Sequence, residues 1–243
     1  MNRQVYYDLT VAGLCLRCGY SFPDAPRYFG HFLAGPFDGI PAVCCTKEDV
    51  VQWEKQISPW NAAAEANALS FRVSDALMEQ NRFVFHAVAL SRQGKAWLIS
   101  GRPGVGKSTQ AEFLRTEHPG EFAYICGDRP VLEQCADGSF LVHPSPWNGK
   151  EDRGGAPAAP LAGIIFLQRG EENAVAPITP REAAVFGFSG VLQTADSVER
   201  IELAARCVDS LLRAVPLWRL TSYMVPDSTH LLYDAVFAEG GQL

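Results

Sequence analysis

The sequence predicts a mixed α/β fold, and three features of its pattern support this. A short apolar run at 96–100 leads into a glycine-rich loop, and a helical pattern starts directly after the loop. Short apolar runs separated by turn sequences recur between 83 and 167, as the strands of a sheet do. Residues 198–215 carry apolar side chains at the spacing of a helix that buries one face. Helices and strands are thus mixed along the chain, which indicates helices packed on a sheet.

The first part of the chain is predicted to be rich in strands. Residues 4–20 carry apolar side chains in a loose alternation, which predicts a strand. Pro, Gly and aromatic residues dominate 22–41, which predicts loops around short strands, and 42–53 resembles one or two strands. Apolar positions recur at helical spacing over 65–79, so a helix is expected there. Aromatic residues that leave open a role in recognising a partner are Tyr20, Phe22, Tyr28, Phe29, Phe32 and Phe37.

After residue 82 the pattern predicts both strands and helices. Strands are expected at 83–90, 96–100, 124–126, 131–134, 140–143, 161–167 and 217–221. Helices are expected at 107–118, 180–188, 198–215 and 230–238. The segments 91–95 and 136–139 have the composition of hairpin turns, and 144–160 is a loop rich in Gly, Pro and Ala.

The composition is that of an ordinary globular protein with one sizeable core. The chain has 243 residues, of which 47% are hydrophobic and 20% charged. Its net charge of −6 disfavours nucleic acid or an anionic membrane as a partner. No apolar run approaches the roughly 20 residues of a membrane helix, the N-terminus lacks a secretory signal, and the seven scattered cysteines favour reduced thiols. We expect a cytoplasmic protein with a small or peptidic partner; its oligomeric state is not indicated.

The segment Gly101–Ser108 matches the phosphate-binding pattern G-x-x-x-x-G-K-S/T. Its glycines let successive backbone N–H groups converge on an anion at the start of the following helix. The lysine adds a charge for the β- and γ-phosphates, and the serine hydroxyl is a ligand for Mg²⁺. A glycine-rich surface turn is the alternative, but the flanking strand and helix are the context that the motif requires. The residues expected to hold ATP with Mg²⁺ are Gly101, Arg102, Pro103, Gly104, Val105, Gly106, Lys107, Ser108 and Thr109.

Other chemistry receives less support from the sequence. There is no N-K-x-D segment that would favour guanine, no H-R-D segment of protein kinases and no G-x-S-x-G element of hydrolases. Cys15 and Cys18 resemble half of a zinc site, but the second pair would be Cys44 and Cys45, whose adjacency fits tetrahedral geometry poorly. Free thiols are therefore expected rather than zinc.

Three further segments carry a resemblance to a known family. They are Phe85–Leu90 with its His86, the strand end Gly127-Asp128-Arg129, and Pro146-Trp147-Asn148-Gly149-Lys150-Glu151. In their order around the phosphate loop they resemble the catalytic core of the bacterial HPr kinase/phosphorylase family, over about residues 80–240. The HPr-kinase-like proteins often associated with peptide-modification gene clusters are the more similar branch. The resemblance implies the mixed-sheet P-loop core that HPr kinase shares with phosphoenolpyruvate carboxykinase, preceded here by a β-rich N-terminal segment.

We accordingly divide the chain into two parts. Residues 1–82 are expected to form a β-rich N-terminal subdomain with one helix, which matches the family only in general character. Residues 83–243 are expected to form a P-loop kinase-like nucleotide-binding domain. No linker in the sequence marks the boundary.

The resemblance also implies roles for individual residues. His86 corresponds to a family histidine near the transferred phosphate; the alternative is an inert core histidine. Asp128 is expected to hold Mg²⁺ together with Ser108, the alternative being a turn-capping aspartate. HPr kinases carry two adjacent aspartates here, and this chain has Gly127 in place of the first, so whether Asp128 also acts as a base stays open. The expected catalytic residues are His86, Lys107 and Asp128.

Four neighbouring residues are weaker candidates for the site. Arg129 either neutralises charge in the transition state or is a solvated turn residue, and the second role is favoured. In the loop that follows, Lys150 would reach the γ-phosphate and Glu151 would bind metal or acceptor. Trp147 belongs to this functional loop or only anchors it to the surface.

These residues together predict an ATP- and Mg²⁺-dependent phosphotransferase. The γ-phosphoryl group would pass to a hydroxyl of a peptide or protein serine or threonine, or of a small molecule. Two alternatives use the same pocket. One is a catalytically weak or inactive ATP-binding sensor or scaffold, which Gly127 favours, and the other is a phosphorylase or phosphatase that acts on a phosphoprotein.

Overall fold

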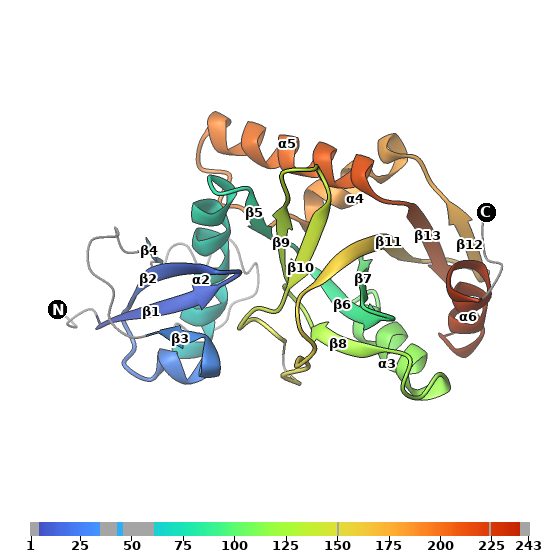
Figure 1. Cartoon of the computed structure of the whole chain (residues 1–243), viewed down its shortest axis with the longest axis horizontal. Coiled ribbons are helices and arrows are strands. Elements are labelled where there is room, and N and C mark those ends of the chain that lie inside the picture. Colours follow the sequence, from blue (N-terminus) through green and yellow to red (C-terminus); the bar gives the residue numbers. More distant parts are fainter. Residues whose placement is uncertain (1–4, 35–42, 46–60, 150, 224, 239–243) are drawn as a thin grey trace.

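The computed structural model describes residues 5–34, 43–45, 61–149, 151–223 and 225–238. Within these ranges the strands form a small four-stranded sheet near the N-terminus and a nine-stranded sheet in the rest of the chain. Figure 1 shows the small sheet beside helix α2 (Ala62–Met78) and the large sheet flanked by the other helices. The mixed α/β architecture predicted from the sequence is confirmed.

The small sheet has the strand order β3-β1-β2-β4. Its strands are β1 (Val5–Val11), β2 (Leu14–Tyr20), β3 (Leu33–Ala34) and β4 (Val43–Cys44). The prediction of a single strand over 4–20 is wrong, because the chain turns at Ala12 and Gly13 and pairs β1 with β2 as an antiparallel hairpin. Both turn residues have positive φ, which Gly13 tolerates readily and which the alternation pattern did not reveal.

Two 3-10 turns, η1 (Ala25–Tyr28) and η2 (Gly30–Phe32), connect β2 to β3. Short elements among loops were expected over 22–41, of which 35–41 lies outside the described residues. Of the second predicted strand segment, 42–53, residues 42 and 46–53 also lie outside them. Helix α2 begins after Asn61, whose side chain accepts a hydrogen bond from Ala64 N–H at 3.0 Å. This N-cap fixes the start of the helix three residues before the predicted one.

The nine-stranded sheet has the order β5-β9-β10-β11-β7-β6-β8, with β13 beside β11 and β12 beside β13. Its strands are β5 (Arg82–Val84), β6 (Ala87–Arg92), β7 (Lys95–Ser100), β8 (Ala123–Cys126), β9 (Val131–Gln134), β10 (Phe140–His143), β11 (Ala159–Arg169), β12 (Ala174–Pro177) and β13 (Leu217–Ser222). Strands β7, β11 and β13 run parallel, and the remaining described pairs are antiparallel. The sheet is therefore mixed, as predicted.

The predicted strand 83–90 is interrupted at Phe85 and His86. Phe85 N–H donates to Pro130 O at 3.0 Å, and His86 N–H donates to Gly190 O at 2.7 Å. These partners are distant in sequence, so the local pattern carried no sign of the break. Strand β12 was not predicted either, because it has only four residues and no clear alternation.

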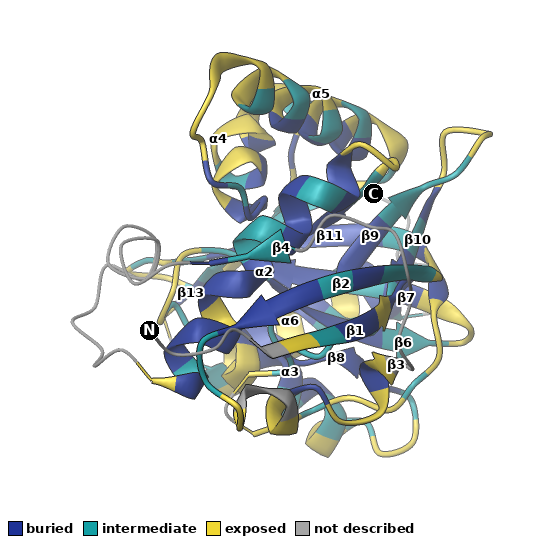
Figure 2. Ribbon diagram, turned by 90° about the vertical axis from the view of Figure 1, so that its left-hand side faces the viewer, coloured by how far each residue is buried: buried dark blue, intermediate teal, exposed yellow. Residues whose placement is uncertain are grey.

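Helices cover both faces of the large sheet. They are α3 (Lys107–Glu117), α4 (Pro180–Gly190), α5 (Val198–Ala214) and α6 (Val225–Leu232), which continues into the π-helical turn η3 (Tyr233–Phe237). One core cluster joins the sheet to α4 and α5, and another joins it to α3 and α6. Figure 2 shows α4 and α5 with exposed outer surfaces above the mostly buried strands. No helix in the described part of the chain is long and apolar enough to cross a membrane.

The closing helix begins at Val225, five residues earlier than predicted. Its first turns place Ser228 and Thr229 in the interior, where both are fully buried. These two hydroxyls bond the amide side chain of Gln110 on α3 at 2.5 and 2.6 Å. The first turns of α6 thus turn polar side chains toward the core, so the apolar periodicity that was used to predict helices is missing there.

A third core cluster joins the two sheets. It contains residues of β1, β2 and α2 together with four from the later chain, Val84, Val131, Trp147 and Leu192. Helix α2 is thus packed on both sides, against the small sheet and against the start of the large one.

Candidate functional site

Three chain segments meet at one edge of the large sheet. Strand β7 ends at Ser100, and Ala87 at the start of the antiparallel β6 lies opposite it. Ser100 Oγ donates to His86 O at 3.0 Å, and Ala87 N–H donates to Asp128 O at 2.9 Å. The strand pairing therefore brings the phosphate loop, His86 and Asp128 to the same place, although they are far apart in the sequence.

The phosphate loop has the backbone conformation that its glycines allow. Gly101, Gly104 and Gly106 have φ of 151°, 74° and 111°. A Cβ on Gly101 would lie 2.4 Å from Leu167 O, so no larger residue fits there. Gly106 is the N-cap of α3 and supplies no side chain to the first N–H groups of the helix. These N–H groups remain available to an anion, and the helix dipole favours one there.

Lys107 is buried, with 7% of its surface exposed, although it carries an ammonium group. Nζ donates to Gly101 O at 3.0 Å and to Arg102 O at 3.3 Å, and it forms no ion pair within the described residues. Burial lowers the pKa of Lys107 to about 8, against the opposing effect of the Asp128 carboxylate. The ammonium is thus bonded to loop carbonyls, with no carboxylate paired to it among the described residues, and its charged form is destabilised by burial. Ser108 and Thr109, the next two residues, are exposed.

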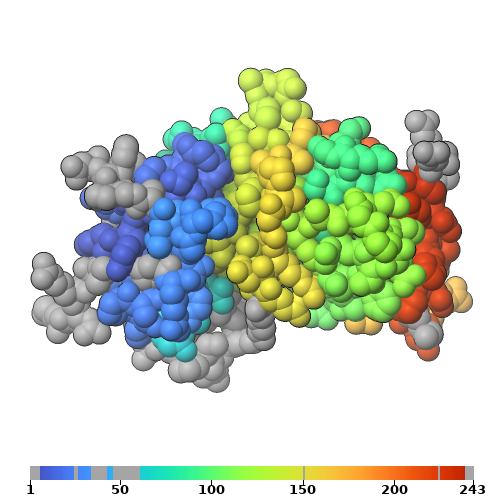
Figure 3. All heavy atoms as spheres, turned by 60° about the horizontal axis from the view of Figure 1, so that its bottom comes forward, coloured from blue at the N-terminus to red at the C-terminus, as the bar shows by residue number. Residues whose placement is uncertain are grey.

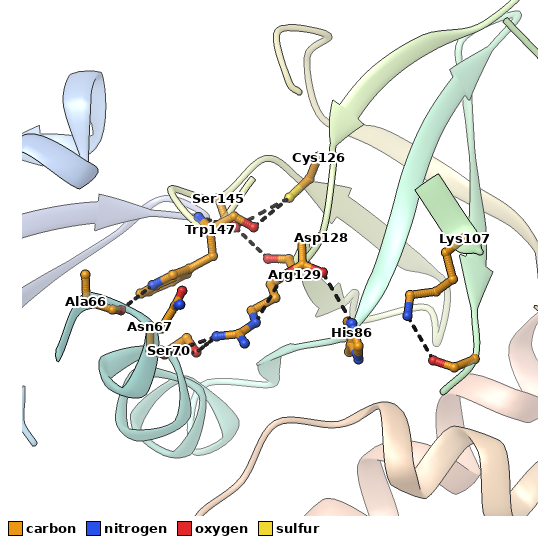
Figure 4. Close-up of polar contacts among 11 residues, drawn as sticks. Ala66, Asn67, Ser70, His86, Lys107, Cys126, Asp128, Arg129, Ser145 and Trp147 are labelled. Carbon is orange, nitrogen blue, oxygen red and sulfur yellow. Dashed lines mark hydrogen bonds and ion pairs between the residues drawn. The ribbon is translucent and has the colours of Figure 1, made fainter. Parts of the chain in front are cut away.

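Asp128 is half-buried and lies between two cationic or titratable partners. Its Oδ1 is 3.3 Å from His86 Nε2, and its Oδ2 is 3.3 Å from Arg129 Nε. Burial alone would raise the pKa of Asp128, but the hydrogen bond from His86 and the charges of Arg129 and Lys107 hold it below its ordinary value. Figure 4 shows Asp128 with its partners His86 and Arg129, and Lys107 nearby. The carboxylate is therefore ionised at neutral pH and held in a fixed orientation.

Arg129 connects this carboxylate to helix α2. Its Nη1 donates to Asn67 O at 3.1 Å and to Ser70 Oγ at 2.8 Å, and the guanidinium lies over the Phe71 ring at 5.8 Å. The expectation of a solvated turn residue is wrong, because the guanidinium is bonded to α2. Local sequence patterns could not predict these contacts, since the partners belong to the N-terminal part of the chain. Through Arg129, a helix from the first 82 residues orients an aspartate of the candidate site (Figure 4).

Trp147 anchors the loop that follows β10. Its side chain is 5% exposed, and its indole N–H donates to Ala66 O of α2 at 2.7 Å. Its ring meets that of Phe29 edge-on at 6.2 Å, and its carbonyl accepts Arg129 N–H at 3.1 Å. Of the two roles predicted for Trp147, the structure supports the anchor. The anchor fixes the loop over the end of β8, directly beside Asp128.

Gly127 is the position at which the resembled family has its first aspartate, and the structure explains the glycine. A Cβ here would lie 2.5 Å from Asn148 O and 3.0 Å from Arg153 O. Both atoms belong to the backbone of the overlying loop. The glycine thus makes room for the loop, so a second carboxylate does not fit at this place.

The remaining loop candidates have different positions. Glu151 is exposed and forms an ion pair with Arg153, and Lys150 lies outside the described residues. Arg153 in the same loop donates to Tyr124 OH at 2.9 Å and lies 3.2 Å from Glu112 Oε2. It thereby joins the loop to the exposed side of α3.

A cleft of about 860 Å³ opens at this site. Ser108, Asp128 and Arg129 line one part of it, and residues 27–32 and 63–67 of the N-terminal part line another. A smaller hollow of about 380 Å³ lies on the surface of α3, beside Thr109, Phe113 and Thr116. Figure 3 shows the yellow part of the chain, which follows β10, between the blue N-terminal residues and the green part that contains α3. Local patterns did not predict that these segments lie together, since this depends on contacts between distant parts of the chain.

The oxygen donors at the site fit Mg²⁺. The Ser108 hydroxyl and the Asp128 carboxylate are hard ligands, and Mg²⁺ in nucleotide sites commonly takes one or two such groups, with phosphates and water completing its shell. No group of three or more His, Cys, Asp or Glu side chains suited to a metal occurs among the described residues.

Comparison with known proteins gives a distant structural likeness. No protein-family model matches the sequence, and no curated protein matches it. Among solved structures, the chain is similar to the HPr(Ser) kinase/phosphatase from Coxiella burnetii, with a TM-score of 0.34 and 11% sequence identity. The likeness covers 62% of this chain and 94% of that one. Residue roles therefore have to be argued from the geometry of the site.

Proposed function

We propose that this chain is an ATP- and Mg²⁺-dependent phosphotransferase that transfers the γ-phosphoryl group to a hydroxyl. The observation that carries the proposal is the buried Lys107, which forms no ion pair within the described residues and lies at the start of α3 near an ionised Asp128 held by His86. An inert glycine turn needs neither a buried ammonium nor an oriented carboxylate next to it.

The loop residues bind the polyphosphate. The backbone N–H groups of 104–109 donate to phosphate oxygens, and the positive end of α3 favours the same charge. Lys107 turns its ammonium from the carbonyls of Gly101 and Arg102 to the β- and γ-phosphates. The new ion pair compensates for the burial that lowers the pKa of Lys107 in the free protein.

Ser108 and Asp128 supply the protein oxygens for the metal. When bound, Mg²⁺ neutralises charge on the phosphates and so lowers the barrier to transfer. Asp128 is held for this purpose by His86 on one oxygen and by Arg129 on the other.

Asp128 and His86 also receive the acceptor. A hydroxyl that attacks the γ-phosphorus forms the new O–P bond, while the bond to ADP breaks. Its proton passes to Asp128 or, through it, to His86. A carboxylate with a lowered pKa is a weak base, but phosphoryl transfer depends mainly on position and charge neutralisation. The fit of Gly127 to the loop gives the absence of the first aspartate a structural reason that does not require a loss of catalysis.

The test compares wild type with Lys107→Ala and with the control Lys95→Ala. Lys95 is an exposed lysine at the start of β7, the strand that leads into the phosphate loop. Each protein is incubated with labelled ATP, Mg²⁺ and hydroxyl acceptors, and nucleotide binding is measured separately by calorimetry. We expect Lys107→Ala to lose at least about tenfold in affinity and nearly all transfer, since an interaction with the transferred group is removed. Lys95→Ala should match wild type.

The same experiment separates the alternatives. Binding without transfer to any acceptor would identify a nucleotide sensor or scaffold. With a phosphoprotein as substrate in place of ATP, release of phosphate by water would identify a phosphatase, and formation of pyrophosphate from added inorganic phosphate would identify a phosphorylase. Transfer that persists undiminished in Lys107→Ala would contradict the proposal.

A further inference from the structure

Arg169 lies beside the phosphate loop, although the sequence motif of the loop does not include it. It is the last residue of β11, which runs parallel to β7 and pairs Phe166 with Ser100, the residue before the loop. Its Nη2 is 3.5 Å from the point that a Cβ on Gly106 would occupy. Gly106 is the N-cap of α3, so this guanidinium lies where the helix dipole and the first N–H groups favour an anion.

The strand directs the side chain of Arg169 toward α3. Alternate residues of a strand point to the same face of the sheet, so Arg169 points to the same side as Leu167. Leu167 is buried in the cluster that joins this face to Ala111 and Leu114 of α3. The backbone of Arg169 is held on the other edge of β11, where it pairs with Ser222 of β13. A paired strand end, between β7 and β13 in Figure 1, therefore supports the guanidinium.

The guanidinium of Arg169 is available to a ligand. Within the ranges that the structure describes, this exposed side chain forms no ion pair or hydrogen bond, although Glu171 and Glu172 follow closely in the sequence. Other exposed arginines differ, since Arg206 and Arg213 each pair with a carboxylate one helical turn away. All the N–H donors of Arg169 can thus be offered to an anion at the loop.

The arginine that the sequence suggested for charge neutralisation is already engaged. Arg129 pairs with Asp128, and it donates to the backbone of Asn67 and to the Ser70 hydroxyl. It therefore orients the carboxylate and has little freedom to contact a phosphate. Arg169 offers at the loop the cationic group that Arg129 does not.

From this geometry, and on the basis of the proposed function, we propose that Arg169 is a further catalytic residue, which contacts the β-phosphate of ATP and stabilises the charge that develops there during transfer. The β-phosphate is the group that the loop amides and the start of α3 receive. When its bond to the γ-phosphorus breaks, the bridging oxygen keeps the electron pair and becomes a terminal oxygen of ADP. Arg169 donates hydrogen bonds to this phosphate and takes part in no proton transfer.

This role makes the interaction of Arg169 stronger in the transition state than in the complex with ATP. The β-phosphate carries more negative charge in ADP than in ATP, and part of that charge is present when the bond is breaking. An interaction that strengthens along the reaction lowers the barrier to transfer and adds less to the affinity for the substrate. The affinity for ADP should accordingly depend on Arg169 more than the affinity for ATP does.

The experiment compares wild type, Arg169→Ala and the control Arg206→Ala in the full chain. Arg206 is 68% exposed on α5, which packs on the other face of the sheet. Calorimetry with Mg²⁺ measures the affinities for ADP and ATP, and labelled ATP measures kcat with an acceptor that wild type uses. We expect Arg169→Ala to lose at least about 100-fold in kcat. Its affinity for ADP should fall roughly tenfold, and that for ATP by less. Arg206→Ala should match wild type in all three.

Chemical rescue separates a contact with phosphate from a merely structural role. Guanidine hydrochloride, at concentrations well below those that unfold the protein, should restore part of the transfer in Arg169→Ala and none in Lys107→Ala. Arg169→Lys should keep part of the rate, because it retains the charge without the planar fork, and Arg169→Gln should not. Thermal unfolding should be unchanged, since the side chain is exposed. If Arg169→Ala did not fold, Arg169→Gln would be used for the same measurements.

The results distinguish this proposal from the proposed function. Unchanged kcat and ADP affinity in the Arg169 variants would overturn the role of Arg169 and leave the phosphotransferase intact. A reduced rate with unchanged ADP affinity and no rescue by guanidinium would overturn it as well. If wild type transferred phosphate to no acceptor, the phosphotransferase would fail, whereas a roughly tenfold loss of ADP affinity in Arg169→Ala would still support the contact with the β-phosphate. Absence of nucleotide binding in wild type would remove both.

Discussion

Folding and ligand binding have opposite effects on the protonation of the Lys107 side chain. It is almost fully buried, so its ammonium loses hydration, and the carbonyls of Gly101 and Arg102 replace only part of it. Burial lowers the pKa of Lys107 to about 8 as a result. A bound polyphosphate adds negative charge beside the ammonium and raises this pKa again.

Nucleotide affinity should consequently depend on pH above neutrality. Below about pH 8 the ammonium of the free protein is already protonated, so affinity is constant there. Above about pH 8 binding must take up a proton, and affinity should fall by up to about tenfold per pH unit until the pKa of the complex is reached. Calorimetry at pH 9 in buffers of different ionisation enthalpy measures this proton uptake directly.

Lys107→Arg is the matched control for the pH effect. Guanidinium stays charged over this range, so its residual affinity should show no such fall with pH. The same pH profile in both proteins would assign the titration to another group. The sequence motif alone predicted that Lys107 binds phosphate, but its lowered pKa follows from burial, which the motif does not contain.

The loop 144–155 is the element that shapes the site around Asp128. Trp147 pins it to α2, Arg153 ties it to Tyr124, and the carbonyls of Asn148 and Arg153 lie against Gly127. The sequence analysis left open whether this loop belongs to the site, and its anchor and its closeness to the end of β8 follow from tertiary contacts. Local patterns likewise located the hairpin β6–β7 and the α3 start, whereas the break at Phe85 and His86 depends on Pro130 and Gly190.

Introducing an aspartate at Gly127, where HPr kinases carry one, should therefore lower both the stability and the transfer rate of this protein. In Gly127→Asp, the Cβ would lie 2.5 Å from Asn148 O, so the loop must move away from Asp128. We expect a loss of stability of about 1–3 kcal/mol, as for other overpacked sites, and slower transfer rather than faster. Thermal unfolding and the transfer rate are the measurements.

The control for this variant is Ala158→Asp, which adds the same charge at an exposed position just before β11. It should leave both stability and rate nearly unchanged. A Gly127→Asp protein with wild-type stability and increased transfer would show that the end of β8 has room for a second carboxylate, contrary to the backbone contacts described above.

At the scale of the whole molecule, the predicted division at residues 82 and 83 passes through a shared core. Helix α2 precedes the boundary, and Val84, Val131, Trp147 and Leu192 after it belong to the same buried cluster. The β-rich character of the first part and the P-loop character of the second were accessible from local patterns. Their association was not, because contacts such as Arg129 to Asn67 join residues 62 positions apart.

A shared core predicts that the two parts unfold together. Trp147 is the test residue, since it is 5% exposed, packs edge-on against Phe29 and donates to Ala66 O at 2.7 Å. Trp147→Ala should cost about 3–5 kcal/mol, the range for truncating a buried aromatic residue, while Tyr223→Ala at an exposed position should cost little. In urea, wild type should lose secondary structure and ATP binding in one coincident transition, and Trp147→Ala should shift both curves equally. If ATP binding instead survived a first transition that melts α2 and the small sheet, the two parts would be independent domains, and the positioning of Asp128 through Arg129 would be dispensable for nucleotide binding.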